Sequence, residues 1–190
     1  LDIDDVLNNA SLQGNMTLGS LVTHGDAYNL AITGNDVDIG GRTYFYNTGT
    51  LTLGNTSNDS IVFADGAIAY GLSSGPSLVY LNAFIESLNT VFEYGDVVLN
   101  GDSTIKLGGG TGTITLNGTV NGNNHDLRII GGNSSTTTFK DTVTNIDELR
   151  VVSAQNVSLQ KTVTVANFIQ ESGTGSTTIT SGGGLIATNG

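Results

Sequence analysis

The sequence predicts an all-β fold, a β-solenoid of stacked coils with about 20–23 residues in each coil. One phrase occurs three times, as TLNGTV at 115–120, TFKDTV at 138–143 and SLQKTV at 158–163. A second phrase is interleaved with it, as DLRII at 126–130 and ELRVV at 148–152. The leading apolar residues of the first phrase are 23 and 20 residues apart. Such a recurring phrase indicates coils that bury their apolar face only by stacking on their neighbours.

The composition fits this fold and excludes several classes of function. Of the 190 residues only 12% are charged, so the polar surface has to come from Thr, Ser and Asn. The net charge is −11 and the 6 Lys and Arg are scattered, which argues against nucleic acid as a partner. The chain has no cysteine for disulfides or thiolate chemistry, and no apolar run reaches the length of a membrane span.

We expect a single solenoid domain over residues 1–190. Its predicted parts are an acidic lead-in at 1–13, the first coils at 14–73, an irregular or helical insertion at 74–95 and regular coils at 96–190. The segment 15–22 matches 113–120 at three positions, which indicates one plan for the front and the back of the chain. Between them, 36–41, 50–54 and 60–64 are predicted strands that end at Gly, Asn and Asp turns.

Alternation within the strands predicts which side chains form the core. In the segment 113–116, apolar and hydroxyl residues alternate, so Ile114 and Leu116 face inward and the threonines face outward. Glycines at 108–110, 131–132 and 182–184 supply the positive φ values that sharp corners need. Parallel stacking then predicts one inward ladder, made of Leu116, Phe139, Leu159 and Ile179, with rungs about 4.8 Å apart.

The segment near 77–92 has a different spacing. Leu78, Leu81, Ile85, Leu88 and Phe92 follow one another at steps of 3, 4, 3 and 4 residues, which favours a short helix. Apolar residues also alternate between 79 and 85, so two irregular strands are the alternative interpretation. A helix here would cover the flank of the solenoid or separate two blocks of coils.

Three segments, FEYGDVVL at 92–99, GTVNG at 118–122 and DLRI at 126–129, resemble the degenerate repeats of filamentous-haemagglutinin-like and autotransporter adhesins. The resemblance covers about residues 90–190, with a weaker echo over 14–65. It implies a right-handed parallel β-helix, export to the bacterial cell surface, and a role as a stalk or in adhesion. The chain departs from the secretion domain of the two-partner type, which carries Asn-Pro motifs, because its single proline, Pro76, follows Gly75. We therefore expect an internal piece of such a protein or a smaller relative.

Two pairs of residues are candidate site residues. Asp36 and Asp38 lie at i and i+2 on a predicted strand and share one face, as the acid and base of a β-helical glycosidase would. No basic residue accompanies them, so a solvated strand edge is the simpler interpretation. Tyr44 and Tyr46 also share a face and offer a surface on which a sugar stacks, although half-buried cross-strand tyrosines are more frequent.

Metal binding has weaker support in the sequence. His24 and His125 occupy comparable places in two matched repeats, but turn histidines beside Asp are common without a metal. Oxygen ligands for calcium occur at Asp2, Asp4, Asp5, Asp36 and Asp38 and at 58–59, yet the nonapeptide of calcium-loaded β-rolls is absent. We expect no metal or cofactor to be required and no catalytic residue, with calcium as the candidate ion if there is one.

The predicted function is that of a non-enzymatic extracellular structural protein, an adhesin stalk or a self-assembling surface filament subunit. The expected partner is another copy or the rest of a longer chain, joined head to tail, with surface glycans as a further candidate. A carbohydrate-active β-helix, either lyase or glycosidase, or a carbohydrate-binding module is the alternative. It would need acids and bases clustered across adjacent coils, and the sparse bases argue against that. An ice-binding solenoid is suggested by threonines at 111, 113, 115, 162 and 164, but Lys140, Asp141 and Lys161 interrupt a regular array.

Overall fold

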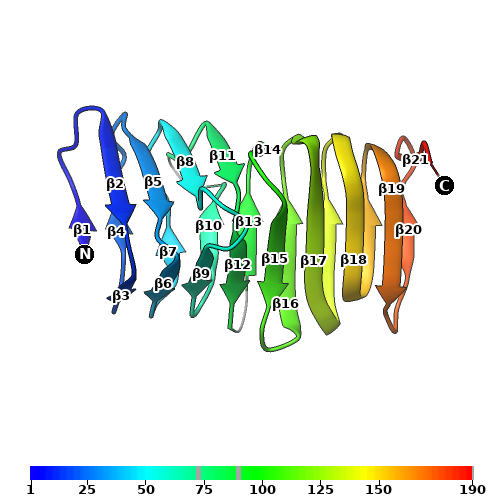
Figure 1. The fold of residues 1–190 in the computed structure, drawn as a ribbon. Helices are drawn as coiled ribbons and strands as arrows, with labels where there is room; N and C mark the ends of the chain where they lie inside the picture. The colour runs from blue at the N-terminus through cyan, green and yellow to red at the C-terminus, as the bar shows by residue number, and fades with distance from the viewer. Residues whose placement is uncertain (72–73, 89–90, 190) are drawn as a thin grey trace.

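The computed structural model describes residues 1–71, 74–88 and 91–189. These residues form an all-β structure without a helix, a parallel β-solenoid of about 8 turns, which confirms the predicted fold class. Figure 1 shows the coils side by side from the N-terminus at one end of the stack to the C-terminus at the other. No helix of the described residues is long and apolar enough to cross a membrane.

Each turn of the chain adds one strand to each of three parallel stacks, which we call face 1, face 2 and face 3. Face 1 contains β2 (Asn9–Gln13), β5 (Asn29–Thr33), β8 (Thr50–Leu53), β11 (Leu78–Leu81), β14 (Val97–Leu99) and β21 (Gly184–Ala187). Face 2 contains β3 (Met16–Leu18), β6 (Asp36–Ile39), β9 (Ser60–Phe63), β12 (Phe84–Ser87) and β15 (Ser103–Leu107). Face 3 contains β7 (Thr43–Tyr44), β10 (Ala67–Ala69), β13 (Val91–Tyr94), β16 (Thr111–Leu116) and β20 (Thr177–Ile179), and it is extended at the N-terminal end by a separate two-stranded sheet of β1 (Asp2–Ile3) and β4 (Val22–Thr23), which contacts β7.

Three long strands continue around the corners, where their pairing shifts register, and contribute to more than one face. They are β17 (Val120–Phe139), β18 (Val143–Leu159) and β19 (Thr162–Ser172). In β17 the residues 120–121 pair on face 1, 127–130 on face 2 and 134–139 on face 3. The coils of the C-terminal half are thus nearly continuous β-structure, as Figure 1 shows for β17 and β18.

Inward side chains of each face stack on equivalent side chains of the next coil. On face 1 the register joins Leu30, Leu51, Val79, Val97, Val120, Val143 and Val163. On face 2 it joins Val37, Ile61, Ile85, Ile105, Ile129 and Val151. All of these side chains are buried. Burying one such side chain contributes about 1.5–3 kcal/mol, so a slip by one residue would be costly on every rung.

The four residues of the ladder predicted from the sequence lie in register on face 3. Leu116 pairs with Phe139, Phe139 with Leu159, and Leu159 with Ile179. The first three are buried, whereas Ile179 is 47% exposed. Ile179 belongs to β20, which pairs with β18 and has no further strand of the described residues on its other side.

The helix predicted near 77–92 is wrong. The described residues of this segment form β11, β12 and the start of β13, each paired with strands on both sides. The segment follows the alternating pattern of a strand, because Val79, Leu81, Ala83 and Ile85 are buried while Leu88 is 45% exposed. A parallel strand gains inter-coil hydrogen bonds and a place in the ladder, which an amphipathic helix at this position would forgo.

Polar side chains hold consecutive coils together at the corners. The side-chain oxygen Oδ1 of Asn29 accepts hydrogen bonds from the backbone N (2.9 Å) and Oγ1 (3.1 Å) of Thr50, one coil further along. Asp96 Oδ1 accepts from the backbone N of Thr119 (2.7 Å) in the same way. Glycines stack at one corner, where Gly132 has a φ of 86° and a Cβ there would collide with the backbone of Gly110. These contacts explain why Asn, Asp, Thr and Gly occur at the corners between the strands.

Candidate functional site

A charged hollow of about 340 Å³ lies on face 2, over β15, β17 and β18. Its walls come from three consecutive coils and from one loop residue of an earlier coil. The lining residues are Ser57, Asp102, Ser103, Thr104, Asp126, Leu127, Arg128, Glu148 and Arg150. The hollow therefore combines three carboxylates with two guanidinium groups.

The strand register places acid beside acid and arginine beside arginine. Arg128 pairs with Arg150 across the coils, and Thr104 takes the same position on the coil before. Asp126 and Glu148 each lie two residues before their arginine, and Asp102 lies two residues before Thr104. Neighbouring strands are about 4.8 Å apart, so the hollow presents an acidic row and a basic row that run along the solenoid axis.

Two of the acids in the hollow also accept hydrogen bonds from the backbone of the next coil. Asp102 Oδ1 accepts a hydrogen bond from the backbone N of Asp126 (3.0 Å), and Asp126 Oδ1 accepts one from the backbone N of Glu148 (2.9 Å). Burial raises the pKa of Asp126, and the nearby carboxylates of Asp102, Asp147 and Glu148 raise it further, against the hydrogen bond from Glu148. The negative charge of Asp126 is thus incompletely compensated in the folded protein.

The two arginines differ in how far they are neutralised. Arg150 Nε lies 2.6 Å from Glu148 Oε1, and the Arg150 guanidinium also contacts the carboxylate of Glu171 on the following coil. The hydrogen bond to Arg150 lowers the pKa of Glu148, and the two glutamates raise the pKa of Arg150. Arg128 is exposed and forms no hydrogen bond or ion pair with another residue that the structure describes.

Arg128 and Arg150 differ in their ion pairs because the acids beside them differ in length. Glu148 reaches Arg150 two residues along its own strand, whereas the shorter Asp126 points one oxygen at the backbone of the next coil. Arg128 is therefore left facing the hollow without a carboxylate of its own. The expectation that the sparse bases form no cluster with acids across adjacent coils is wrong at this position.

The sequence contained a signal for this hollow. The repeated phrase with Asp126-Leu127-Arg128 and Glu148-Leu149-Arg150 places an acid and an arginine two residues apart on the same side of a strand, around an inward leucine. Stacked in register, the two copies bring four charges onto adjacent coils. Asp102 could not be assigned to the row from this phrase, because its coil carries Thr104 in place of an arginine.

Asp36 and Asp38, the predicted acidic pair, lie on β6 with both side chains exposed on face 2. They do share one face, as expected. Asp38 lines a hollow of about 380 Å³ with Leu18, Ile39 and Leu88, among other residues. None of the described residues that line this hollow is a base that could move a proton or polarise a substrate beside Asp38.

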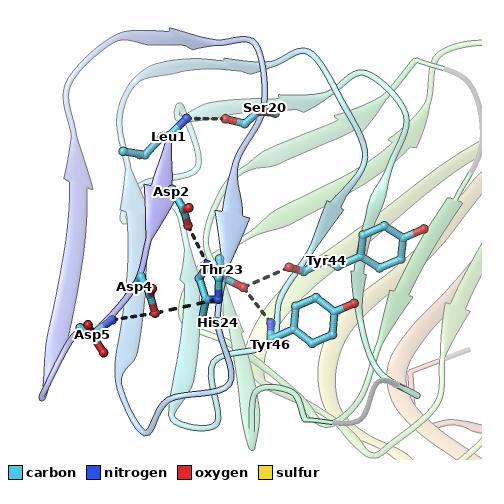
Figure 2. Close-up of polar contacts among 9 residues, drawn as sticks. All are labelled: Leu1, Asp2, Asp4, Asp5, Ser20, Thr23, His24, Tyr44 and Tyr46. Atoms are coloured by element: carbon cyan, nitrogen blue, oxygen red, sulfur yellow. Dashed lines mark hydrogen bonds and ion pairs between the residues drawn. The ribbon is translucent and has the colours of Figure 1, made fainter.

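Tyr44 and Tyr46 extend from face 3 in the same direction, as Figure 2 shows. Their ring centroids are 6.3 Å apart with 24° between the planes, so the two rings stack on each other. Tyr44 is 38% exposed, and both rings line a small hollow of about 140 Å³ that also includes Val22 and Arg42. Thr23 fixes this strand, because its Oγ1 donates to Tyr44 O (3.0 Å) and accepts from Tyr46 N (2.8 Å).

The two histidines do not form one site. His24 Nε2 lies 2.8 Å from Asp2 Oδ1, and its Nδ1 lies 3.9 Å from Asp4 Oδ1, so it joins the first strand to the next coil (Figure 2). The hydrogen bond to Asp2 raises the pKa of His24, and the charges of neighbouring aspartates act in the same direction. His125 Nδ1 instead lies 3.6 Å from Oδ1 of Asp102, a residue that lines the charged hollow.

The oxygen groups considered for calcium have different environments. Carboxylate oxygens of Asp4, Asp5 and Asp26 lie within 4.8 Å of one another near the N-terminal end of the stack. Asp59 is buried, and its carboxylate accepts hydrogen bonds from Asn55 N (2.8 Å) and Thr56 Oγ1 (2.9 Å), which closes a turn. Asp59 thus has a structural role, and calcium binding at the other acids stays a prediction.

The threonines that suggested an ice-binding array are divided between two faces. Thr113 and Thr115 lie on face 3, paired with Thr136 and Thr138. Those at 162 and 164 belong to β19 and pair with β21 on face 1. The two sets cannot form the single flat array that ice recognition requires.

Comparison with known proteins identifies no relative of this chain. No family model matches the chain, and no curated protein or solved structure matches it. The resemblance of residues 90–190 to adhesin repeats therefore stays a prediction from the sequence.

Proposed function

We propose that this chain is a non-enzymatic structural segment of an extracellular or bacterial cell-surface protein, an adhesin stalk or a filament subunit. One observation carries the proposal. The ladder of face 1 runs without interruption from Ala10 on β2 to Leu185 on β21, across every coil between them. A stack in which each coil is paired with its neighbours by hydrogen bonds and apolar contacts forms a rigid rod, and a stalk requires such a rod.

The surface chemistry supports the same role. Thr, Ser and Asn occupy many outward positions near the two ends of the stack, whereas the middle coils also present apolar and aromatic residues outward, such as Ile68, Tyr80 and Phe84. The chain carries 17 acids against 6 bases, and a net charge of −11 keeps it hydrated and discourages lateral association between rods. The adhesin-like repeats noted in the sequence support the assignment to the cell surface.

The last coil supports joining to another coil. Ile179 on β20 continues the inward ladder and is 47% exposed, and β20 and β21 pair on one side only among the described residues. An apolar coil end with unpaired strand edges is a template for further strand addition. The covering coil comes from the rest of a longer chain or from a second copy stacked head to tail.

A carbohydrate-active β-helix is the second candidate, and the charged hollow favours it. Asp102 and Asp126 occupy equivalent positions on adjacent coils, whose strands are about 4.8 Å apart, and the two carboxyl groups of a retaining glycosidase are roughly 5 Å apart. The raised pKa of Asp126 is the property of a general acid. Against this, both aspartates have an oxygen committed to a backbone amide of the next coil, which is sufficient reason for their presence.

An activity assay separates the two candidates. The purified chain is incubated with pectin, alginate and a β-glucan, and the release of reducing ends and of unsaturated uronates is followed. The structural role predicts no release above the buffer control, with or without added calcium. Release by the parent chain that Asp126→Asn abolishes, while Asp36→Asn does not, would overturn the proposal and assign catalysis to the hollow.

A further inference from the structure

We propose that the charged hollow on face 2 binds a neutral saccharide chain that lies along the solenoid axis. This inference is independent of the stalk role, because it concerns a side surface and not the ends. The volume of about 340 Å³ is within the range of small-ligand sites. The hollow also brings uncommitted hydrogen-bonding groups of opposite sign together.

The groups available to a ligand are few and can be named. Arg128 offers a planar set of N–H donors without a protein acceptor among the described residues. Asp102 and Asp126 each use one oxygen for the next coil, which leaves their second oxygen to accept from a ligand. Hydroxyl groups on adjacent ring carbons donate to carboxylates and accept from a guanidinium, so a sugar satisfies both rows at once.

The spacing of the rows suits a chain rather than a single ring. Equivalent side chains on successive coils are about 4.8 Å apart, close to the length of one pyranose residue in an extended polysaccharide. Asp102 and Asp126, which each keep one oxygen free for a ligand, therefore meet successive sugar residues of a chain that runs across the coils. This fit comes from the geometry of the solenoid itself.

The local charge selects a neutral chain over an acidic one. Three carboxylates line the hollow against two guanidinium groups, and Arg150 is already neutralised by Glu148 and Glu171. The whole chain carries −11, so a polyuronate is repelled at long range as well. A neutral glycan has no such penalty, and its hydroxyls compensate the unfavourable charge of Asp126.

Binding is tested by titrating the full chain with cellohexaose, xylohexaose, mannohexaose and chitohexaose, with hexagalacturonate as the acidic counterpart. Backbone amide shifts in NMR spectra follow the site, and calorimetry gives the affinity. At least one neutral hexasaccharide should bind saturably and shift the amides of residues 102–104, 126–128 and 148–150. Arg128→Gln should weaken that binding by at least about tenfold, because it removes charged hydrogen bonds.

The variants are matched so that folding and general charge effects are separated from binding. Asp126→Asn keeps an oxygen for the amide of Glu148 and removes the charge, and it should weaken binding as Arg128→Gln does. Lys106→Gln removes a charge from face 2 outside the hollow, where Lys106 pairs with Glu86 (3.0 Å), and should leave the affinity unchanged. The proposal is overturned if no neutral hexasaccharide binds, if the shifts lie elsewhere, if Arg128→Gln binds like the parent, or if hexagalacturonate binds more tightly.

Discussion

At the scale of single residues, each inward side chain of the solenoid packs against equivalent side chains of the two neighbouring coils and so stabilises those coils as well as its own. Phe139 is buried on face 3 with Leu116 on one side and Leu159 on the other. Outward residues such as Thr138 make no such contribution to the core. Polar side chains at the corners also link neighbouring coils, because Asn29 Oδ1 accepts a hydrogen bond from the backbone amide of Thr50 on the next coil.

Truncating Phe139 should therefore destabilise the whole stack. We expect Phe139→Ala to lower the free energy of unfolding by about 3–5 kcal/mol, as large-to-small changes in cores do, in urea titrations followed by circular dichroism. Thr138→Ala is the matched control on the same strand and should change stability little. Phe139→Lys should prevent folding, and a Phe139→Lys chain that melts like the parent would show that the inward ladder is misassigned.

His24 should make the attachment of the first strand depend on pH. Its pKa is raised by the hydrogen bond to Asp2, so its pKa in the folded protein lies above the value of 6.5 for an unperturbed histidine. The stabilising interaction is then complete below pH 6.5 and is lost as the pH rises through the folded pKa. An NMR titration of His24 and of the amides of β1 measures this. His24→Gln should remove the pH dependence of those amides between neutral and mildly acidic pH, and unchanged β1 titration in that variant would contradict the assignment.

At the scale of elements, the segment from β11 to β13 shows what decides between strand and helix in this chain. Helical spacing of leucines was present, yet the alternate residues Val79, Leu81 and Ile85 are the ones that entered the ladders. A neighbouring strand on each side supplies hydrogen bonds and apolar contacts that a local periodicity count does not include. Short apolar runs inside a solenoid are therefore better assigned from the period of the whole array.

The strand assignment predicts unequal effects for two leucines that a helix would have treated alike. Leu81 is buried on face 1, whereas Leu88 is 45% exposed. Leu81→Lys should abolish cooperative unfolding or leave the chain aggregated, because it buries an unpaired charge. Leu88→Lys should fold and melt close to the parent. Thermal melts of both variants test this, and equal destabilisation by the two changes would favour the helical arrangement.

The strand content and the inward residues of the regular repeats could be predicted because alternation and period are local properties of the sequence. The repeated acid–arginine phrase indicated part of the charged hollow, but its full lining could not be predicted, because the lining depends on how corners of different length align. Asp102, Asp126 and Glu148 are 24 and 22 residues apart, and the pairing of β17 with β18 includes several register shifts at the corners. A corner with one residue more or fewer would turn these acids to a different side.

At the scale of the whole molecule, the stack has two unlike ends and one continuous core. The length of 190 residues at about 21 residues per coil predicts nine coils, and the solenoid has about 8 turns. Coil length varies along the stack, since Leu51 and its partner Val79 are 28 residues apart, whereas Val79 and its partner Val97 are 18 residues apart. The longer coils place loops at the corners but do not interrupt the ladders, so rigidity along the axis is kept.

The central proposal, that the chain is a building block of a longer rod, is tested most directly by its association. Sedimentation velocity and electron microscopy are carried out over a concentration series for the parent, for Ile179→Lys and for Thr178→Lys. Ile179 continues the inward ladder at the exposed end, while Thr178 on the same strand pairs with the outward Ser158 and controls for the added charge. We expect the parent and Thr178→Lys to form end-to-end rods as concentration rises, and Ile179→Lys to stay monomeric. A parent chain that stays monomeric and folded at millimolar concentration, or an Ile179→Lys variant that forms the same rods, would contradict the proposal.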